Sequence, residues 1–100
     1  MTTKYILEGK IPKAVDDVVV WGRWFETAKR HVNQTELPNN VRVSTVFLGI
    51  DHSFDGGVPI LFGTMIFGGE HDEYQERYAT WEEAEVGHQR AVKLARKKGS

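Results

Sequence analysis

The hydrophobic and polar positions of the chain follow two different periods. In residues 41–50 and 60–67 both alternating sets of positions are largely apolar, which is typical of strands in the middle of a sheet. After residue 80 the spacing becomes helical, and one face of that helix carries Trp81, Ala84, His88, Ala91, Val92 and Ala95. The pattern predicts an α+β fold, in which an antiparallel sheet of about four to five strands packs one face against a C-terminal amphipathic helix.

A capping box, Thr80-Trp81-Glu82-Glu83, marks the start of this helix. The Thr80 hydroxyl can accept from the N–H of Glu83, and the Glu83 carboxylate can reach back to the N–H of Thr80. We therefore expect the helix to begin directly after Thr80, with Trp81 buried under its first turn.

Shorter segments complete the predicted sheet. Residues 5–7 form a β-prone run that Gly9 and Pro12 should end. Residues 31–37 should pair with 41–50 as a hairpin whose Pro38-Asn39-Asn40 loop suits a type I turn. Residues 74–78 alternate aromatic and polar side chains and predict an edge strand. The glycine pairs Gly56-Gly57 and Gly68-Gly69 are expected as turn residues between strands.

Residues 17–28 predict a second, shorter helix. Val18, Trp21, Phe25 and Ala28 recur at helical spacing after Asp16 and Asp17, either of which is a good N-cap. The alternative is a strand through Trp21, because residues 18–20 are three β-branched valines and Gly22 weakens a helix.

Composition is that of one globular domain. The chain has 100 residues, of which 40% are hydrophobic and 27% charged, and we assign residues 1–98 to the domain and treat 99–100 as a cloning remnant. It has no cysteine, no apolar leader and no apolar run long enough to span a membrane, so we expect a cytoplasmic protein without a membrane segment. A formal net charge of −1 gives no general attraction to nucleic acid, and the basic residues near the C-terminus fit a solvated helix end.

The loop that joins the two central strands carries the most polar residues of the apolar region. Asp51, His52 and Asp55 are our candidate binding residues there, because rigid strands commonly present functional loops. Asp51, Ser53 and Asp55 imitate the start of a calcium loop, but Phe62 stands where a bidentate Glu is required. We expect an Asx-bonded turn and predict no metal site.

The remaining chemistry-bearing residues indicate no enzyme. The four histidines, His31, His52, His71 and His88, show no metal-binding spacing, and His88 lies on the apolar helix stripe, where we expect a hydrogen-bonded core residue. A nucleophile elbow, a P-loop and a dinucleotide-binding glycine motif are all missing from the sequence, so we predict no cofactor.

The aromatic cluster Trp21, Trp24 and Phe25 is divided between two expected roles. Trp21 and Phe25 should face the sheet, whereas Trp24 should sit at the margin beside Arg23. Tryptophan and arginine are enriched at binding hot spots, so Trp24 and Arg23 are further candidate binding residues.

Three segments together resemble a family of small uncharacterised phage and prophage proteins. They are Trp24-Phe25-Glu26-Thr27-Ala28, then Val43-Ser44-Thr45-Val46-Phe47-Leu48-Gly49 with Asp51-His52, and Arg77-Tyr78-Ala79-Thr80-Trp81-Glu82-Glu83-Ala84-Glu85 with Gly87-His88. The resemblance spans roughly residues 15–95. It implies a phage-type genetic context and carries no catalytic residue to this chain.

These observations favour a non-catalytic protein that binds a host or phage protein. The alternative is a small-ligand-binding protein or small hydrolase that uses the Asp51-His52 loop, with His88 as a further candidate. We also expect a homodimer, because both faces of the central strands need cover and the 17–28 helix is too short to shield a whole sheet face.

Overall fold

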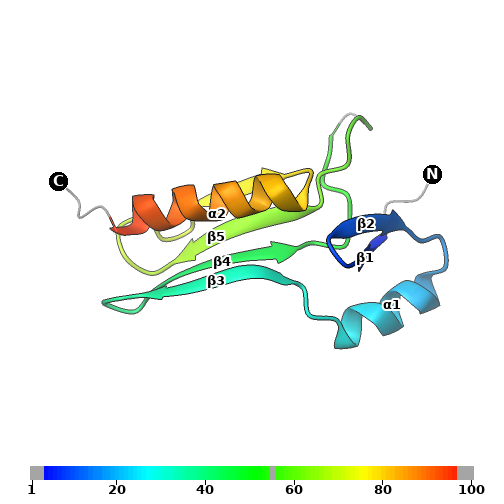
Figure 1. The fold of residues 1–100 in the computed structure, drawn as a ribbon, viewed down its shortest axis with the longest axis horizontal. Helices are drawn as coiled ribbons and strands as arrows, with labels where there is room; N and C mark the ends of the chain where they lie inside the picture. The colour runs from blue at the N-terminus through cyan, green and yellow to red at the C-terminus, as the bar shows by residue number, and fades with distance from the viewer. Residues whose placement is uncertain (1–3, 55, 97–100) are drawn as a thin grey trace.

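The computed structural model describes residues 4–54 and 56–96, which form a mixed α+β fold with two antiparallel sheets and two helices (Figure 1). The elements are β1 (Tyr5–Glu8), β2 (Ile11–Ala14), α1 (Val18–Thr27), β3 (His31–Leu37), β4 (Val41–Phe47), β5 (Phe62–Phe67), β6 (Gln75–Tyr78) and α2 (Trp81–Arg96). Asp55 and residues 99–100, which the sequence singled out, lie outside the described part of the chain.

The main sheet has the strand order β3-β4-β5-β6, and every neighbouring pair is antiparallel. The two strands with apolar residues on both faces, β4 and β5, are therefore central, and β6 is an edge strand, as predicted. β4 ends at Phe47, three residues earlier than expected. Gly49 has a φ of 78° there, and a side chain at that position would start 2.9 Å from Cε1 of Phe25.

The capping box forms as predicted. The N–H of Glu83 donates to Thr80 Oγ1 at 3.1 Å, while Glu83 Oε1 accepts from the N–H groups of Thr80 and Ala79. Helix α2 then covers one face of the main sheet with its small residues, and Ala84, Gly87, His88, Ala91 and Val92 are buried (Figure 1). Trp81 is only half-buried, packed edge-on against Phe62 at 6.2 Å.

Two local predictions were wrong. Pro12 does not end the first strand, because it lies within β2, which pairs with β1 and has Leu7 opposite Pro12. An edge strand tolerates proline, since the missing N–H can face solvent. The Pro38-Asn39-Asn40 loop is not a type I turn: Asn39 and Asn40 have φ values of 64° and 62°, and a type I turn needs negative φ at both central residues.

Helix α1 spans the predicted region, with Asp17 as its N-cap through bonds to the N–H groups of Val19 and Val20. It does not cover the main sheet. Figure 1 shows α1 past the end of that sheet, beside β1 and β2. The Trp21 indole N–H points at the carbonyl oxygens of Tyr5 and Gly49, 3.2 and 3.1 Å away. The sheet face opposite α2 is therefore left without cover by α1.

The core between α2 and the sheet consists of two apolar clusters. One contains Val41, Val43, Ile66, Ala91 and Val92, and the other contains Phe47, Leu61, Phe62, Tyr78 and Ala84. Buried polar residues separate them, because Thr45 lies between Val43 and Phe47 on β4 and Thr64 lies between Phe62 and Ile66 on β5. Within the described residues, neither helix is long and apolar enough to cross a membrane.

Candidate functional site

A chain of hydrogen bonds crosses the core at the level of His88. The imidazole Nε2 lies 2.9 Å from the Thr35 hydroxyl, and Nδ1 lies 2.7 Å from the Thr45 hydroxyl. Thr45 and Thr64 are 2.5 Å apart, and Thr64 is 3.0 Å from the hydroxyl of Tyr78. The chain therefore joins α2 to all four strands of the main sheet. His88 is fully buried and hydrogen-bonded, as the sequence predicted.

The protons of this chain have one consistent direction. Tyr78 lies 2.9 Å from Oε1 of Glu76, an ionised carboxylate that can only accept, so the single phenolic proton is donated to Glu76. Tyr78 then accepts from Thr64, and Thr64 accepts from Thr45. The Thr45 oxygen is left to accept from His88, so Nδ1 carries a proton. Burial lowers the pKa of His88 and favours the neutral ring, whose Nε2 then accepts from the Thr35 hydroxyl.

Along the chain of hydrogen bonds, only the end at the protein surface, Glu76 with Arg90, is ionised. Burial alone would raise the pKa of Glu76, but hydrogen bonds from Arg90 and Tyr78 outweigh burial and lower it. Arg90 Nη2 lies 2.5 Å from Glu76 Oε1. Burial raises the pKa of Tyr78 to about 12 and lowers the pKa of His88. Both groups are neutral at physiological pH, so the interior of the chain holds no charge.

This chain of hydrogen bonds is suited to holding α2 on the sheet rather than to catalysis. Both ring nitrogens of His88 are engaged by threonine hydroxyls, and the side chain has no exposed area. A general base must lie within hydrogen-bond reach of a substrate proton. His88 therefore cannot join His52 in an acid–base pair without unfolding of α2 from the sheet.

The loop after β4 is closed by the carboxylate of Asp51. Its Oδ1 accepts from the N–H of Ser53 at 2.8 Å and from the N–H of Ile60 at 2.9 Å, and its Oδ2 accepts from the Ser53 hydroxyl at 3.0 Å. The backbone bonds from Ile60 and Ser53 lower the pKa of Asp51. The Asx turn that the sequence predicted is present, and Asp51 also ties the two ends of the loop together.

His52 and Ser53 show no nucleophile–base arrangement. The Ser53 hydroxyl donates to a carboxylate, and the His52 side chain is exposed beside it. In the part of the chain that the structure describes, no three His, Asp or Glu residues are grouped closely enough to hold a metal ion.

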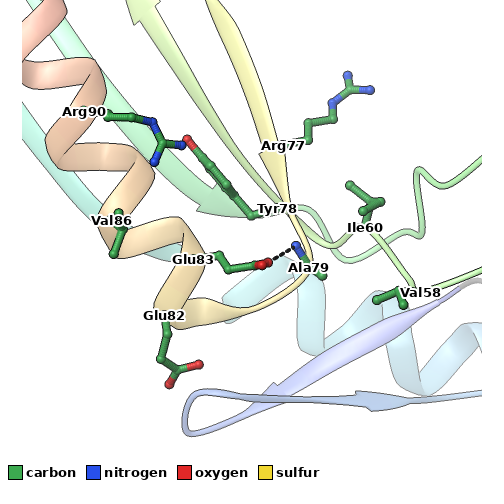
Figure 2. A pocket seen from close by; sticks show the side chains of 9 residues that line it. All are labelled: Val58, Ile60, Arg77, Tyr78, Ala79, Glu82, Glu83, Val86 and Arg90. Atoms are coloured by element: carbon green, nitrogen blue, oxygen red, sulfur yellow. Dashed lines mark hydrogen bonds between the residues drawn. The ribbon is translucent and has the colours of Figure 1, made fainter.

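A long groove lies along β6 and the start of α2. This β6 groove has a volume of about 740 Å³ and is lined by Val58, Ile60, Arg77, Tyr78, Ala79, Glu82, Glu83, Val86 and Arg90. Figure 2 shows Arg77 pointing away from α2 and the Glu83 carboxylate held at the N–H of Ala79. Two of the lining residues are large exposed hydrophobics: Val58 at 71% and Val86 at 61% of full exposure.

A second hollow, of about 510 Å³, adjoins the β6 groove. This loop hollow is lined by His52, Ser53, Phe54, Gly57, Val58, Ile60 and Arg77, and it shares Val58, Ile60 and Arg77 with the groove. The Phe54 side chain is fully exposed at its rim. Among the described residues Arg77 has no ion-pair partner. Exposed apolar side chains and a free cation thus meet at one end of the molecule.

The predicted pair Arg23 and Trp24 lies elsewhere. Trp24 is half-buried and packs edge-on against Phe47 at 5.7 Å, so its ring belongs to the end of the core, while Arg23 is exposed on α1. The structure therefore brings Asp51 and His52 together in one loop and does not bring Arg23 or Trp24 to it.

Sequence reasoning missed the β6 groove, because its residues come from a loop, a strand end and a helix. It also missed the hydrogen-bonded chain beyond His88. A signal for the chain was present: Thr45 and Thr64 are polar residues in the middle of apolar strands, and such positions need partners in a core.

In comparisons with protein-family models, curated proteins and solved structures, no match to this chain was found. The resemblance to small phage and prophage proteins stays a prediction.

Proposed function

We propose that this domain is a non-catalytic, phage-type accessory protein that binds a segment of a host or phage protein in the β6 groove. The observation that carries the proposal is the gathering of exposed Phe54, Val58 and Val86 around two adjoining hollows. Exposed apolar patches of this kind mark interaction sites on soluble domains. Host takeover or counter-defence in the host cytoplasm is the role that this context suggests.

The groove favours a partner segment with an apolar anchor next to an acidic residue. Val58, Ile60 and Val86 are apolar lining residues, and Arg77, which has no ion-pair partner among the described residues, lies where the two hollows meet. Of the other charged residues that line the groove, Arg90 bonds Glu76 and Glu83 caps α2, whereas Glu82 has no hydrogen-bond or ion-pair partner among the described residues. Glu82 lies on α2, and Figure 2 shows Arg77 pointing away from that helix. An arginine binds a carboxylate through two parallel hydrogen bonds, which would fix the register of the segment.

The polar groups of the described chain support binding over catalysis. The carboxylate of Asp51, the hydroxyl of Ser53 and both nitrogens of His88 are used inside the fold. A nucleophile and base in mutual reach would be needed for hydrolysis.

A displayed library of random peptides tests the proposal without knowledge of the natural partner. We expect selection on the wild-type domain to enrich peptides with a large apolar residue beside Asp or Glu. Their affinity should fall at least tenfold with Val86→Glu and with Arg77→Ala. Val20→Glu is the matched control, because Val20 is an exposed valine on the distant helix α1. Enrichment of no motif, or equal binding to all variants, would reject the groove as the binding site.

The alternative is a small anionic ligand in the loop hollow, and the specific observation that favours it is the presence of His52 and Arg77 in one hollow. Titration with inorganic phosphate, followed by the NMR signals of His52 and Arg77, separates the two. Saturable shifts at micromolar phosphate would support this alternative, and unchanged spectra at millimolar phosphate would remove it.

A further inference from the structure

The face of the main sheet opposite α2 forms a second surface, which shares Arg77 with the β6 groove and is otherwise distinct from it. This open face carries Gln34 and Glu36 on β3, Arg42, Ser44 and Val46 on β4, Gly63, Met65 and Phe67 on β5, and Gln75 and Arg77 on β6. Val46 and Met65 are half-buried, and Phe67 is exposed. The corresponding positions on the α2 side, such as Val43, Phe47 and Ile66, have no exposed area.

The composition of the open face is that of an interface between proteins. Its two central strands hold one charged residue, Arg42, whose guanidinium lies over the Phe67 ring at 4.8 Å. The remaining charges, Glu36 and Arg77, lie on the edge strands β3 and β6. An apolar centre with Met, Phe and Arg inside a polar rim is the usual anatomy of a protein interface.

The open face has a shallow depression at Gly63, called the dent below. The dent has a volume of about 180 Å³ and is lined by Val46, Leu48, Met65 and Phe67 among others. A Cβ at Gly63 would be 3.6 Å from Leu48 Cδ2, an ordinary contact, so the monomer itself does not require glycine at this position. The depression is large enough to accept a small apolar side chain, and Val46 lies directly beside it as the cross-strand partner of Gly63.

We propose that two copies of this chain pair open face to open face about a two-fold axis parallel to the strands and midway between β4 and β5. That axis places β4 of one copy over β5 of the other. The register pairs on this face are Arg42–Phe67, Ser44–Met65 and Val46–Gly63. Val46 then points into the dent at the partner's Gly63, and Met65 lies over the partner's Ser44, so large side chains meet small ones on both sides of the axis.

A two-fold axis perpendicular to the strands at the level of Ser44 and Met65 fits less well. It would place Ser44 on the partner's Ser44 and Met65 on the partner's Met65, which leaves a gap at one position and a collision at the next. A perpendicular axis between this level and that of Val46 avoids the collision, and label distances separate it from the parallel axis. The parallel axis also places Arg42 against the partner's Phe67, where the cation can lie over a second ring. The alternation of large and small side chains along β4 and β5 makes the open face complementary to the same face of a second copy.

The size of the open face sets the strength of the pairing. Four strands spaced about 4.8 Å apart and six residues rising about 3.4 Å each give a flat footprint of roughly 20 by 20 Å. Two copies bury roughly 800 Å² before side-chain relief is counted, which is less than the roughly 1,000 Å² of a stable interface and corresponds to a weak, reversible dimer. The expected dissociation constant is therefore micromolar rather than nanomolar.

Sedimentation equilibrium from about 1 μM to about 1 mM tests the pairing. We expect the wild-type mass to rise from 11.4 kDa towards twice that value. Val46→Lys should raise the dissociation constant at least about 30-fold, and Gly63→Ala about five- to tenfold, because each fills or charges the dent. Val20→Lys on α1 is the matched control and should dimerise as the wild type does. If circular dichroism shows that Val46→Lys is unfolded, Met65→Lys takes its place.

Distances between labels test the axis. The natural chain has no cysteine, so Gln34→Cys and Gln75→Cys each give a single label on opposite edges of the open face. In a mixed sample a donor on Gln34→Cys and an acceptor on Gln75→Cys should be closer than two labels on Gln34→Cys, because the axis places β3 over the partner's β6.

A wild-type mass that stays at 11.4 kDa throughout, or a folded Val46→Lys that dimerises with unchanged affinity, would overturn the proposal. A shorter distance between two Gln34→Cys labels than between the mixed labels would overturn the axis. Failure of the β6 groove is distinguishable from failure here, since Val86→Glu should leave the dimer unchanged.

Discussion

The two faces of the main sheet carry similar apolar residues but differ in how far these residues are buried. On β5 the adjacent residues Met65 and Ile66 are both large and apolar, yet Ile66 has no exposed area and Met65 is half-exposed. The difference is that α2 covers one face, whereas α1 lies past the end of the sheet. Apolar side chains thus predict that a face needs cover, but the neighbouring elements decide which face receives it.

The faces differ in their polar groups as well. On the α2 side Thr45, Thr64 and His88 are buried, and each has hydrogen-bond partners. On the open face Ser44 and Gln75 can bond to water. A buried polar group without a partner is costly, so only the α2 side requires an exact arrangement of donors and acceptors. The following substitutions compare the two faces by the free energy of unfolding, measured below 1 μM protein where the monomer is expected.

Truncation of adjacent residues on β5 should give the largest contrast. Ile66→Ala removes buried volume between α2 and the sheet and should cost about 2–5 kcal/mol. Met65→Ala removes a half-exposed side chain and should cost less than about 1 kcal/mol. Urea denaturation measures both. Equal losses would mean that the open face is covered in the monomer.

A methyl group added to each face at a glycine should have opposite effects. The Cβ of Gly87→Ala would overlap the Tyr78 hydroxyl, so α2 must move away from the sheet, at a cost of about 1–3 kcal/mol. The Cβ of Gly63→Ala meets only ordinary contacts, and a strand prefers alanine to glycine by roughly 0.5–1 kcal/mol. A destabilising Gly63→Ala together with a neutral Gly87→Ala would reverse the assignment of the faces.

Replacement of one hydroxyl on each face tests the hydrogen-bonded chain. Thr45→Val keeps the shape of the side chain but leaves the Nδ1 proton of His88 without its acceptor, which should cost about 1–3 kcal/mol. Ser44→Val, on the neighbouring residue of β4, should change stability by no more than about 0.5 kcal/mol. Thermal unfolding of both variants checks the contrast, and a silent Thr45→Val would contradict a continuous chain.

Acid should weaken the α2 side through His88 in particular. Burial lowers the pKa of folded His88 below its ordinary value of 6.5, so the unfolded chain binds the extra proton first. The contribution of neutral His88 to the free energy of unfolding should therefore be fully present above pH 6.5. As the pH falls from 6.5 towards the pKa of folded His88, the free energy of unfolding should decrease by at most about 1.4 kcal/mol per pH unit. The ring nitrogens of His88 contact the neutral hydroxyls of Thr35 and Thr45, and burial is the one cause of its lowered pKa, so no carboxylate among the described residues offsets the charge.

His88→Gln is the control for this pH dependence, because an amide keeps one donor and one acceptor but does not titrate. Denaturation between pH 7 and 5 should show a steeper loss for the wild type than for His88→Gln, with Glu76 and Asp51 ionised throughout. If the free energy of unfolding falls with pH equally in the wild type and in His88→Gln, then His88 has the same pKa in the folded and unfolded protein.

Local signals determined much of this fold. The capping box at Thr80, the N-cap at Asp17 and the apolar stripe of α2 act within a few residues, so they could be recognised in sequence and have their predicted effects. The central position of β4 and β5 followed from apolar residues on both of their faces. His88 was predictable as a core residue because it lies on the apolar helix stripe.

Tertiary structure alone decided the rest. The partners of His88 come from β3 and β4, 53 and 43 residues away, and helical spacing holds no information on such distances. The β6 groove combines Val58, Arg77 and Val86 from three elements. It forms because the segment before β5 returns beside the end of β6, where the N–H of Leu61 donates to the carbonyl oxygen of Tyr78 at 3.0 Å. The position of α1 was likewise set by where Trp21 and Phe25 pack around Gly49, not by the amphipathic pattern that formed the helix. Periodicity records which face of an element is apolar, whereas the choice of neighbour depends on contacts between residues far apart in the chain.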